Sequence, residues 1–176
     1  MNIIFLDVDG VLNSKAYFEQ NKDRGHADIN DYNLQILAKI YHANSAKIVL
    51  SSSWRELDDE SDIHVYWMYE YLVNELARYN MEIIDKTPVI GMNRPLEIKT
   101  WLDNRNDKSE IFWISLDDDF PEEKYEECGI GGHLVRTIFF TDNIENGGLQ
   151  EKHIELANKL FAEQEINNEE ANSTRI

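Results

Sequence analysis

Short, almost continuous apolar runs alternate along the chain with segments in which apolar residues recur every three or four positions. The runs are rich in Ile, Val, Leu and Phe, which is typical of strands that are covered on both faces. Five such strands are predicted, at residues 2–8, 46–51, 81–86, 110–116 and 133–141.

The segments between these strands carry the apolar stripes of amphipathic helices. Four helices are predicted, around residues 34–41, 65–76, 95–102 and 149–161. Strands that alternate with helices predict an α/β fold with a doubly wound, mostly parallel five-stranded sheet and helices on both faces. We expect one domain over residues 1–162, followed by a polar C-terminal tail over 163–176 that frays from residue 165 onward.

The charge balance narrows the classes of function. The 176 residues include 34 Asp and Glu against 17 Lys and Arg, a formal net charge of -17. Such a charge favours solubility and repels polyanions, so broad charge-driven binding to nucleic acid or membranes is not expected. The single cysteine, Cys128, cannot form an internal disulfide, and neither a signal peptide nor an apolar run of the roughly 20 residues needed to span a bilayer is apparent. We therefore expect a soluble, cytoplasmic protein.

Oxygen-bearing side chains follow three of the predicted strands at the point where each strand ends. In an open parallel sheet, ligands bind beyond the carboxyl ends of the strands, near the point where the strand order reverses. Carboxylates brought together there repel one another unless a cation lies between them, and Mg²⁺ suits a site of carboxylates, waters and a substrate phosphate. The side chains are Asp7 and Asp9 after the first strand, Ser51, Ser52 and Ser53 after the second, and Asp117, Asp118 and Asp119 after the fourth.

These strand ends carry a family resemblance. DVDGVLN (residues 7–13) resembles the first motif, DxDG(V/T)(L/V), of the haloacid dehalogenase (HAD) superfamily of phosphohydrolases. The second, third and fourth motifs of that superfamily resemble KIVLSSSWR (47–55), NRPLEI (93–98) and WISLDDDF (113–120), in the same order. The likeness covers residues 2–119. SSSWR, LDDD and the later GL near residue 149 are most similar to the small HAD domains associated with RNA-repair proteins.

The resemblance implies a catalytic role for four residues. Asp7 would be the nucleophile that forms an aspartyl-phosphate. Asp9 would be the general acid and base, and its backbone carbonyl would face the metal. Ser52 would hold a phosphoryl oxygen, with Ser51 and Ser53 open as alternatives. Arg94 would stabilise charge on the phosphoryl group and on Asp7.

The remaining roles are less sharply defined. Asp118 is the first choice for direct contact with Mg²⁺ and Asp117 for an orienting role, although Asp119 leaves this register open by one residue. Gly10 would allow the backbone turn after the first motif. Trp54 and Arg55 would flank the site. Trp54 is either a substrate contact or a core residue, and Arg55 is either a substrate ligand or an ordinary surface residue.

The spacing of the motifs leaves no room for a full cap domain, and residues 14–30 form a flap at most. An open site would admit a large phosphorylated substrate. The sequence therefore predicts a Mg²⁺-dependent phosphomonoester hydrolase that acts through an aspartyl-phosphate on a nucleic-acid end or another large substrate. One alternative is a small-metabolite or nucleotide phosphatase, and another is a non-catalytic acidic protein that binds a partner on a HAD scaffold. No pattern indicates an oligomeric state.

Overall fold

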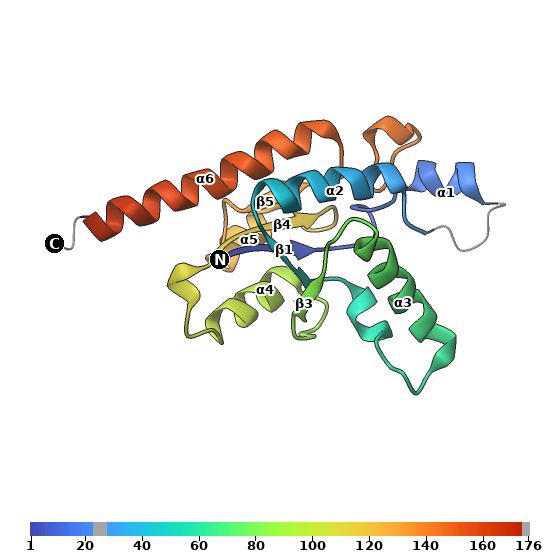
Figure 1. Ribbon diagram of the computed structural model, residues 1–176, viewed down its shortest axis with the longest axis horizontal. Helices are drawn as coiled ribbons and strands as arrows, with labels where there is room; N and C mark the ends of the chain where they lie inside the picture. The colour runs from blue at the N-terminus through green and yellow to red at the C-terminus, as the bar shows by residue number, and fades with distance from the viewer. Residues whose placement is uncertain (23–27, 174–176) are drawn as a thin grey trace.

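Five parallel strands form one sheet in the computed structural model, which describes residues 1–22 and 28–173 (Figure 1). The strand order is β3-β2-β1-β4-β5. This order confirms the predicted doubly wound α/β fold, and it reverses direction between β1 and β4. The strands are β1 (Asn2–Leu6), β2 (Lys47–Leu50), β3 (Ile83–Lys86), β4 (Phe112–Asp117) and β5 (Leu134–Arg136).

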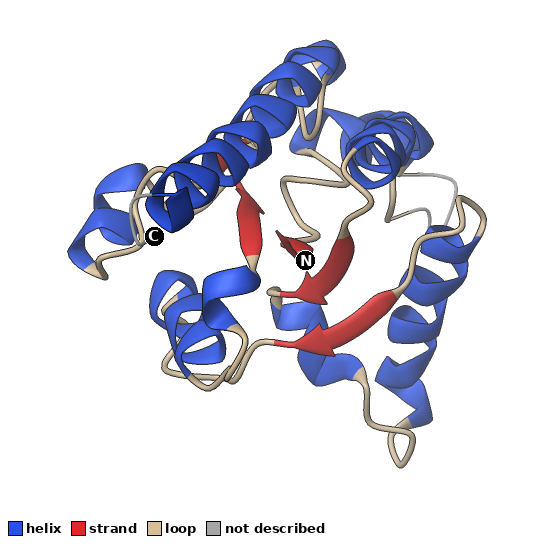
Figure 2. Cartoon of the chain, turned by 60° about the vertical axis from the view of Figure 1, so that its left-hand side comes forward, coloured by secondary structure: helices blue, strands red, loops and turns tan. Residues whose placement is uncertain are grey.

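Helices cover both faces of this sheet, as Figures 1 and 2 show. They are α1 (Lys15–Asn21), α2 (Asp31–Ala43), α3 (Ile63–Ala77), α4 (Arg94–Asp103), α5 (Glu122–Glu127) and α6 (Glu151–Ser173). Three short 3₁₀ helices join them: η1 (Ser53–Leu57), η2 (Lys108–Glu110) and η3 (Ile144–Asn146). No helix within the described residues is long and apolar enough to cross a membrane.

The alternation of side chains along β1 divides the core into two layers. Ile4 and Leu6 point to one face, where they belong to a cluster with apolar residues of α2, α3 and α6. Ile3 and Phe5 point to the opposite face, toward apolar residues of α4 and α5. All four side chains are fully buried, so this strand is apolar on both faces, as its sequence predicted. The burial fixes the position of the residues that follow β1.

Two C-terminal elements differ from the prediction. Strand β5 ends at Arg136 rather than near residue 141, because the chain then leaves the sheet and forms a loop against the segment after β1. In that loop the carbonyl of Phe139 accepts a hydrogen bond from the Lys15 N–H (3.0 Å). Helix α6 continues to Ser173, through residues that we expected to fray, and the Gln164 side chain pairs with both the backbone N–H and the carbonyl of Trp113 (2.9 Å each).

The predicted flap at 14–30 begins as an ordered helix. Ser14 is fully buried and caps α1, because its hydroxyl accepts a hydrogen bond from the Tyr17 N–H (3.3 Å). Residues 23–27 of the predicted flap lie outside the described residues. Among the described residues, the connections between strands hold helices and turns rather than a second domain, which agrees with the absence of a full cap.

Candidate active site

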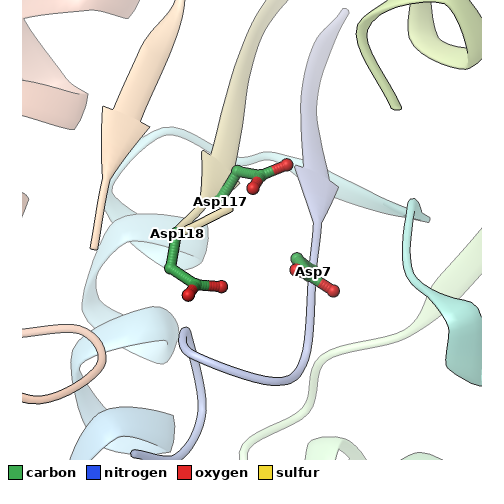
Figure 3. Close-up of side chains that lie close together, drawn as sticks. All are labelled: Asp7, Asp117 and Asp118. Atoms are coloured by element: carbon green, nitrogen blue, oxygen red, sulfur yellow. The ribbon is translucent and has the colours of Figure 1, made fainter. Parts of the chain in front are cut away.

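Three aspartates meet where the strand order reverses, at the carboxyl ends of β1 and β4. Asp7 directly follows β1, Asp117 is the last residue of β4, and Asp118 follows it. Oxygen atoms of the three carboxylates lie within 4.8 Å of one another, and Figure 3 shows their side chains around one space. The sheet therefore brings together three of the four residues that the sequence predicted for the metal, and the carboxylate of the fourth, Asp9, is not in this cluster.

Arg94 bridges two of these aspartates. Its Nη1 lies 2.8 Å from Asp7 Oδ2 and 2.8 Å from Asp117 Oδ2. Arg94 is the first residue of α4, and the Asn93 side chain caps this helix by accepting a hydrogen bond from the Leu96 N–H (3.3 Å). The start of the helix thus directs the guanidinium to the strand ends, as the third motif predicted.

The crowding of carboxylates changes their acidity. Burial raises the pKa of Asp7 to about 8 against the attraction of Arg94, and the nearby Asp117 adds to the rise. Burial also raises the pKa of Asp118 to about 6, with further contributions from Asp117 and Asp119. Asp117 and Asp7 outweigh the burial of Arg94 and raise the pKa of its guanidinium above the ordinary value. Arg94 carries one positive charge, whereas the cluster holds three carboxylates, so positive charge is lacking when all three are ionised.

Asp117 uses both of its oxygens inside the protein. Oδ1 accepts hydrogen bonds from the backbone N–H groups of Asp119 (2.8 Å) and Phe120 (3.2 Å). Oδ2 accepts from Arg94 and from the Tyr125 hydroxyl (3.2 Å). Asp117 is fully buried, whereas Asp118 is partly exposed. This arrangement supports the predicted division of labour, in which Asp117 orients its neighbours and Asp118 is available to a ligand.

Asp9 stands apart from the acidic cluster and is held by two donors. The Asn13 Nδ2 group donates to Asp9 Oδ1 (2.9 Å), and the Trp54 indole Nε1–H donates to Asp9 Oδ2 (3.0 Å). Trp54 is also a core residue, with 4% of its surface exposed. It thus combines the core role and the site role that the sequence left open. The side chain of Asp9 is exposed, so it can reach a substrate.

Gly10 is required by the close packing of the turn after β1. Its φ is +75°, and a Cβ at this position would lie 2.1 Å from Cγ of Asp118. Its N–H donates to Asn13 Oδ1 (2.9 Å). Only glycine combines this conformation with this approach, so the turn can lie directly against the metal-binding candidate.

The three serines after β2 are directed to different places. Ser52 is fully buried, and its hydroxyl hydrogen-bonds the Asp7 carboxylate, an interaction that lowers the pKa of Asp7. The Ser51 hydroxyl instead accepts from the Thr87 hydroxyl (3.4 Å). Ser53 is exposed at the pocket mouth. Of the three, Ser52 has the geometry closest to the predicted role in phosphoryl binding.

Arg55 has a different environment from the one that we predicted. Its Nη2 donates to Glu97 Oε2 (2.9 Å) and its Nη1 to the Ser52 carbonyl (2.8 Å). Both side chains of this ion pair are almost fully buried. Glu97 also accepts a hydrogen bond from the Ile90 N–H (2.8 Å). Arg55 therefore ties η1 to α4, and this geometry favours a positioning role over substrate contact.

The candidate site opens into a pocket of about 230 Å³. Two phenylalanines in its wall were not expected, because residues 133–141 read as a strand and only the loop after β5 brings them here. Tyr125 and Glu97 were missed for a similar reason, since their contacts with the site depend on tertiary structure. Asn13 lies within the first motif but carried no predicted role. The pocket is lined by Asp7, Asp9, Ser53, Arg94, Asp118, Asp119, Phe139 and Phe140.

Comparison with known proteins agrees with this arrangement. A family model described as "HAD domain in Swiss Army Knife RNA repair proteins" matches residues 3–153, which includes all four motifs and, apart from Asn2 of β1, all five strands. No curated protein and no solved structure matches the chain. At the level of the family, the match supports a hydrolase of the phosphatase type. The chain belongs to this family of HAD domains.

Proposed function

We propose that the protein is a Mg²⁺-dependent phosphomonoester hydrolase that works through an aspartyl-phosphate on Asp7. The observation that carries the proposal is the single nitrogen of Arg94 that contacts both Asp7 and Asp117, beside Asp118. This contact holds the nucleophile candidate in place at a pocket where negative charge is concentrated. A second acid, Asp9, is held separately two residues away, which supports a distinct role in proton transfer.

The donor set fits Mg²⁺. The candidate ligands are carboxylate oxygens, which hard divalent cations prefer, and Mg²⁺ commonly binds one or two carboxylates together with substrate phosphate. Asp7 and Asp118 would hold the ion, because both line the pocket, whereas Asp117 is fully buried and its two oxygens accept four hydrogen bonds within the protein. The raised pKa values of Asp7 and Asp118 support the same reading, since a cation would relieve the repulsion. Bound Mg²⁺ would offset negative charge on the phosphoryl group.

The residues of the chain then have the following roles in two steps. A carboxylate oxygen of Asp7 attacks phosphorus, the bond from phosphorus to the leaving oxygen breaks, and Asp9 gives that oxygen its proton. Asp9 next takes a proton from water, whose oxygen attacks phosphorus, so inorganic phosphate leaves and Asp7 is restored. Arg94 stabilises the charge that develops on the phosphoryl oxygens, and Ser52 donates its hydroxyl hydrogen to one of them.

The test measures phosphate release with and without Mg²⁺ from an aryl phosphate, nucleotides, sugar phosphates and end-phosphorylated oligonucleotides. We expect Mg²⁺-dependent release that is lost in Asp7→Asn and lowered at least a hundred-fold in Asp9→Asn. If both variants kept full hydrolysis, the mechanism would be wrong. If the folded protein bound Mg²⁺ tightly but released phosphate from none of these substrates, the reading as a non-catalytic partner-binding protein would replace it.

A nucleic-acid end is the proposed substrate class. The name of the matching family refers to RNA repair, and the described residues contain no second domain over the pocket, so a large substrate has access. The net charge of -17 opposes a polyanion, however, and three cations that could offset it near the site are each bonded to carboxylates. They are Arg55 with Glu97, Arg94 with Asp7 and Asp117, and Lys99 with Asp103.

The dependence of activity on salt separates this substrate class from small metabolites. We expect kcat/KM for an end-phosphorylated oligonucleotide to rise with ionic strength, because long-range repulsion between the acidic protein and the polyanion is screened. Under the same conditions a small sugar phosphate should respond weakly. A small ester that outperforms every nucleotide at all salt concentrations would favour the metabolite alternative. A cytoplasmic location also stays a proposal, which the single free cysteine, Cys128, supports.

A further inference from the structure

We propose that Phe140 and its neighbours in the loop after β5 form the subsite for the leaving group, and that this subsite stacks a nucleobase. The inference rests on the proposed phosphatase function and names the chemistry that lies next to the scissile bond. The ligand is a nucleoside phosphate, either a mononucleotide or the end of a nucleic-acid strand.

A second hollow, of about 470 Å³, adjoins the catalytic pocket. The two spaces share three residues of their walls, Asp118, Phe139 and Phe140, so a ligand can extend from one into the other. The rest of the wall comes from the end of β5 and the loop that follows it. These residues are Arg136, Thr137 and Ile138.

Size decides where the leaving group lies. The catalytic pocket, at about 230 Å³, is smaller than the roughly 300–1,000 Å³ typical of sites for whole small molecules. It has room for a phosphoryl group and its ligands, and the remainder of a substrate must continue outward. On the side of Met92 the adjoining space is about 100 Å³, whereas the hollow beside Phe140 falls within the typical range. The substrate therefore extends toward Phe140.

The wall of this hollow offers an aromatic surface on a fixed support. Phe140 is 81% exposed, and its ring meets that of Phe139 at 89°, with centroids 4.9 Å apart. Phe139 in turn packs against Phe18 of α1 at 6.0 Å, and its carbonyl accepts the hydrogen bond from Lys15. The two rings form a corner in which Phe139 is held by its contacts with α1. A ligand that binds there would therefore cost little conformational entropy.

The chemistry of the surroundings favours a nucleobase as the occupant. A base is planar and neutral, so it stacks on phenylalanine without adding negative charge beside Asp118 and Asp119. Arg136 is exposed on the same wall, and no ion pair involving it is found among the described residues. Its guanidinium is available to the next phosphate of a strand, which gives a strand end one contact that a mononucleotide lacks.

The test compares substrates that differ only by the base. Adenosine 5′-monophosphate is paired with ribose 5-phosphate, and an end-phosphorylated oligonucleotide is paired with one whose terminal phosphorylated nucleotide is abasic. We expect Phe140→Ala to lower kcat/KM about ten-fold for the substrates with a base and to leave the abasic partners within about two-fold. Phe140→Trp should restore the preference. The matched control is Met92→Ala, which removes another exposed apolar side chain (82% exposed), in the wall of the neighbouring space of about 100 Å³.

The outcomes separate this inference from the proposed function. If Asp7-dependent hydrolysis persists but Phe140→Ala affects the members of each pair equally, the subsite is wrong and the phosphatase function stands. If no substrate is hydrolysed in a manner that depends on Asp7, both are overturned. A loss of base preference only in the oligonucleotide pair assigns the subsite to strand ends, and a loss in both pairs assigns it to nucleotides in general.

Discussion

The acidic cluster should destabilise the metal-free fold, and Asp7→Asn tests this directly. Asp7 is 4% exposed and lies beside Asp117, so burial raises its pKa from the ordinary 3.8 to about 8. The folded chain therefore keeps a proton that the unfolded chain releases. Since the folded state binds the proton more tightly, the stability of the metal-free protein falls as pH rises from about 4 to about 8. Asparagine has no charge to lose, so the variant escapes this penalty.

The size of the effect follows from the distance in pH between the two pKa values. Each pH unit above 3.8 costs about 1.4 kcal/mol up to the folded value, so the penalty is about 2 kcal/mol at pH 5 and about 4 kcal/mol at pH 7. Relaxation of the buried site and the loss of one partner of Arg94 reduce the gain. We expect Asp7→Asn to stabilise the metal-free protein by about 1–2 kcal/mol at pH 7 and by less than that at pH 5.

The assay is urea unfolding in the presence of a chelator at both pH values. Asp9→Asn is the matched control, because it removes an exposed carboxylate from the same turn. Addition of Mg²⁺ at pH 7 should stabilise the wild-type protein by mass action and leave Asp7→Asn nearly unchanged. A change in stability for Asp7→Asn that is the same at pH 5 and pH 7, or a loss at pH 7 alone, would refute the reasoning.

Three further predictions concern the supports of the site. Gly10→Ala should cost more than about 2 kcal/mol of stability in thermal melts, because its Cβ would overlap a carboxylate, whereas Gly91→Ala, with φ +59° and no atom near its Cβ, should cost about 1 kcal/mol. In urea titrations, Arg55→Met and Glu97→Met should each cost about 3 kcal/mol, and the double variant should cost less than their sum, because each single change leaves a buried charge unpaired. Trp54→Phe should lower kcat about ten-fold with KM within two-fold, since the indole would no longer hold Asp9, the proposed general acid and base; an unchanged kcat would exclude this role for Trp54.

The fold could be predicted from the sequence because its strands are apolar on both faces. Ile3 to Leu6 pack into both layers of the core, and such burial leaves little freedom in where the strand lies. The end of β5 was less predictable, because residues 137–141 are as apolar as a strand but owe their position to contacts with the segment after β1. The C-terminal part of α6 was predicted to fray because its sequence is polar. Nothing in that sequence indicates that the Gln164 side chain bonds to the backbone of Trp113.

The candidate site followed from the sequence where a residue stands at a strand end, and not where its role depends on a distant partner. Asp7 and Asp118 could be placed because parallel strands align their carboxyl ends. Arg55 could not, because nothing local indicates that it pairs with Glu97, forty-two residues away in the chain. The wall formed by Phe140 was equally hidden, since its position depends on where β5 ends. Local pattern predicts the chemistry of such a site more readily than its specificity.

The distribution of charge links metal binding to substrate binding. Arg94 is already shared between Asp7 and Asp117. A phosphate that enters the metal-free pocket would therefore be repelled by the negative charges of Asp118 and Asp119. A divalent cation held by Asp7 and Asp118 would offset this negative charge and so favour the binding of a phosphoryl group. Each ligand must raise the affinity of the other by the same factor, because the coupling is reciprocal. Under the proposed function, metal and phosphate would therefore bind as a unit, and discrimination among substrates would be left to the wall beside them that contains Phe140.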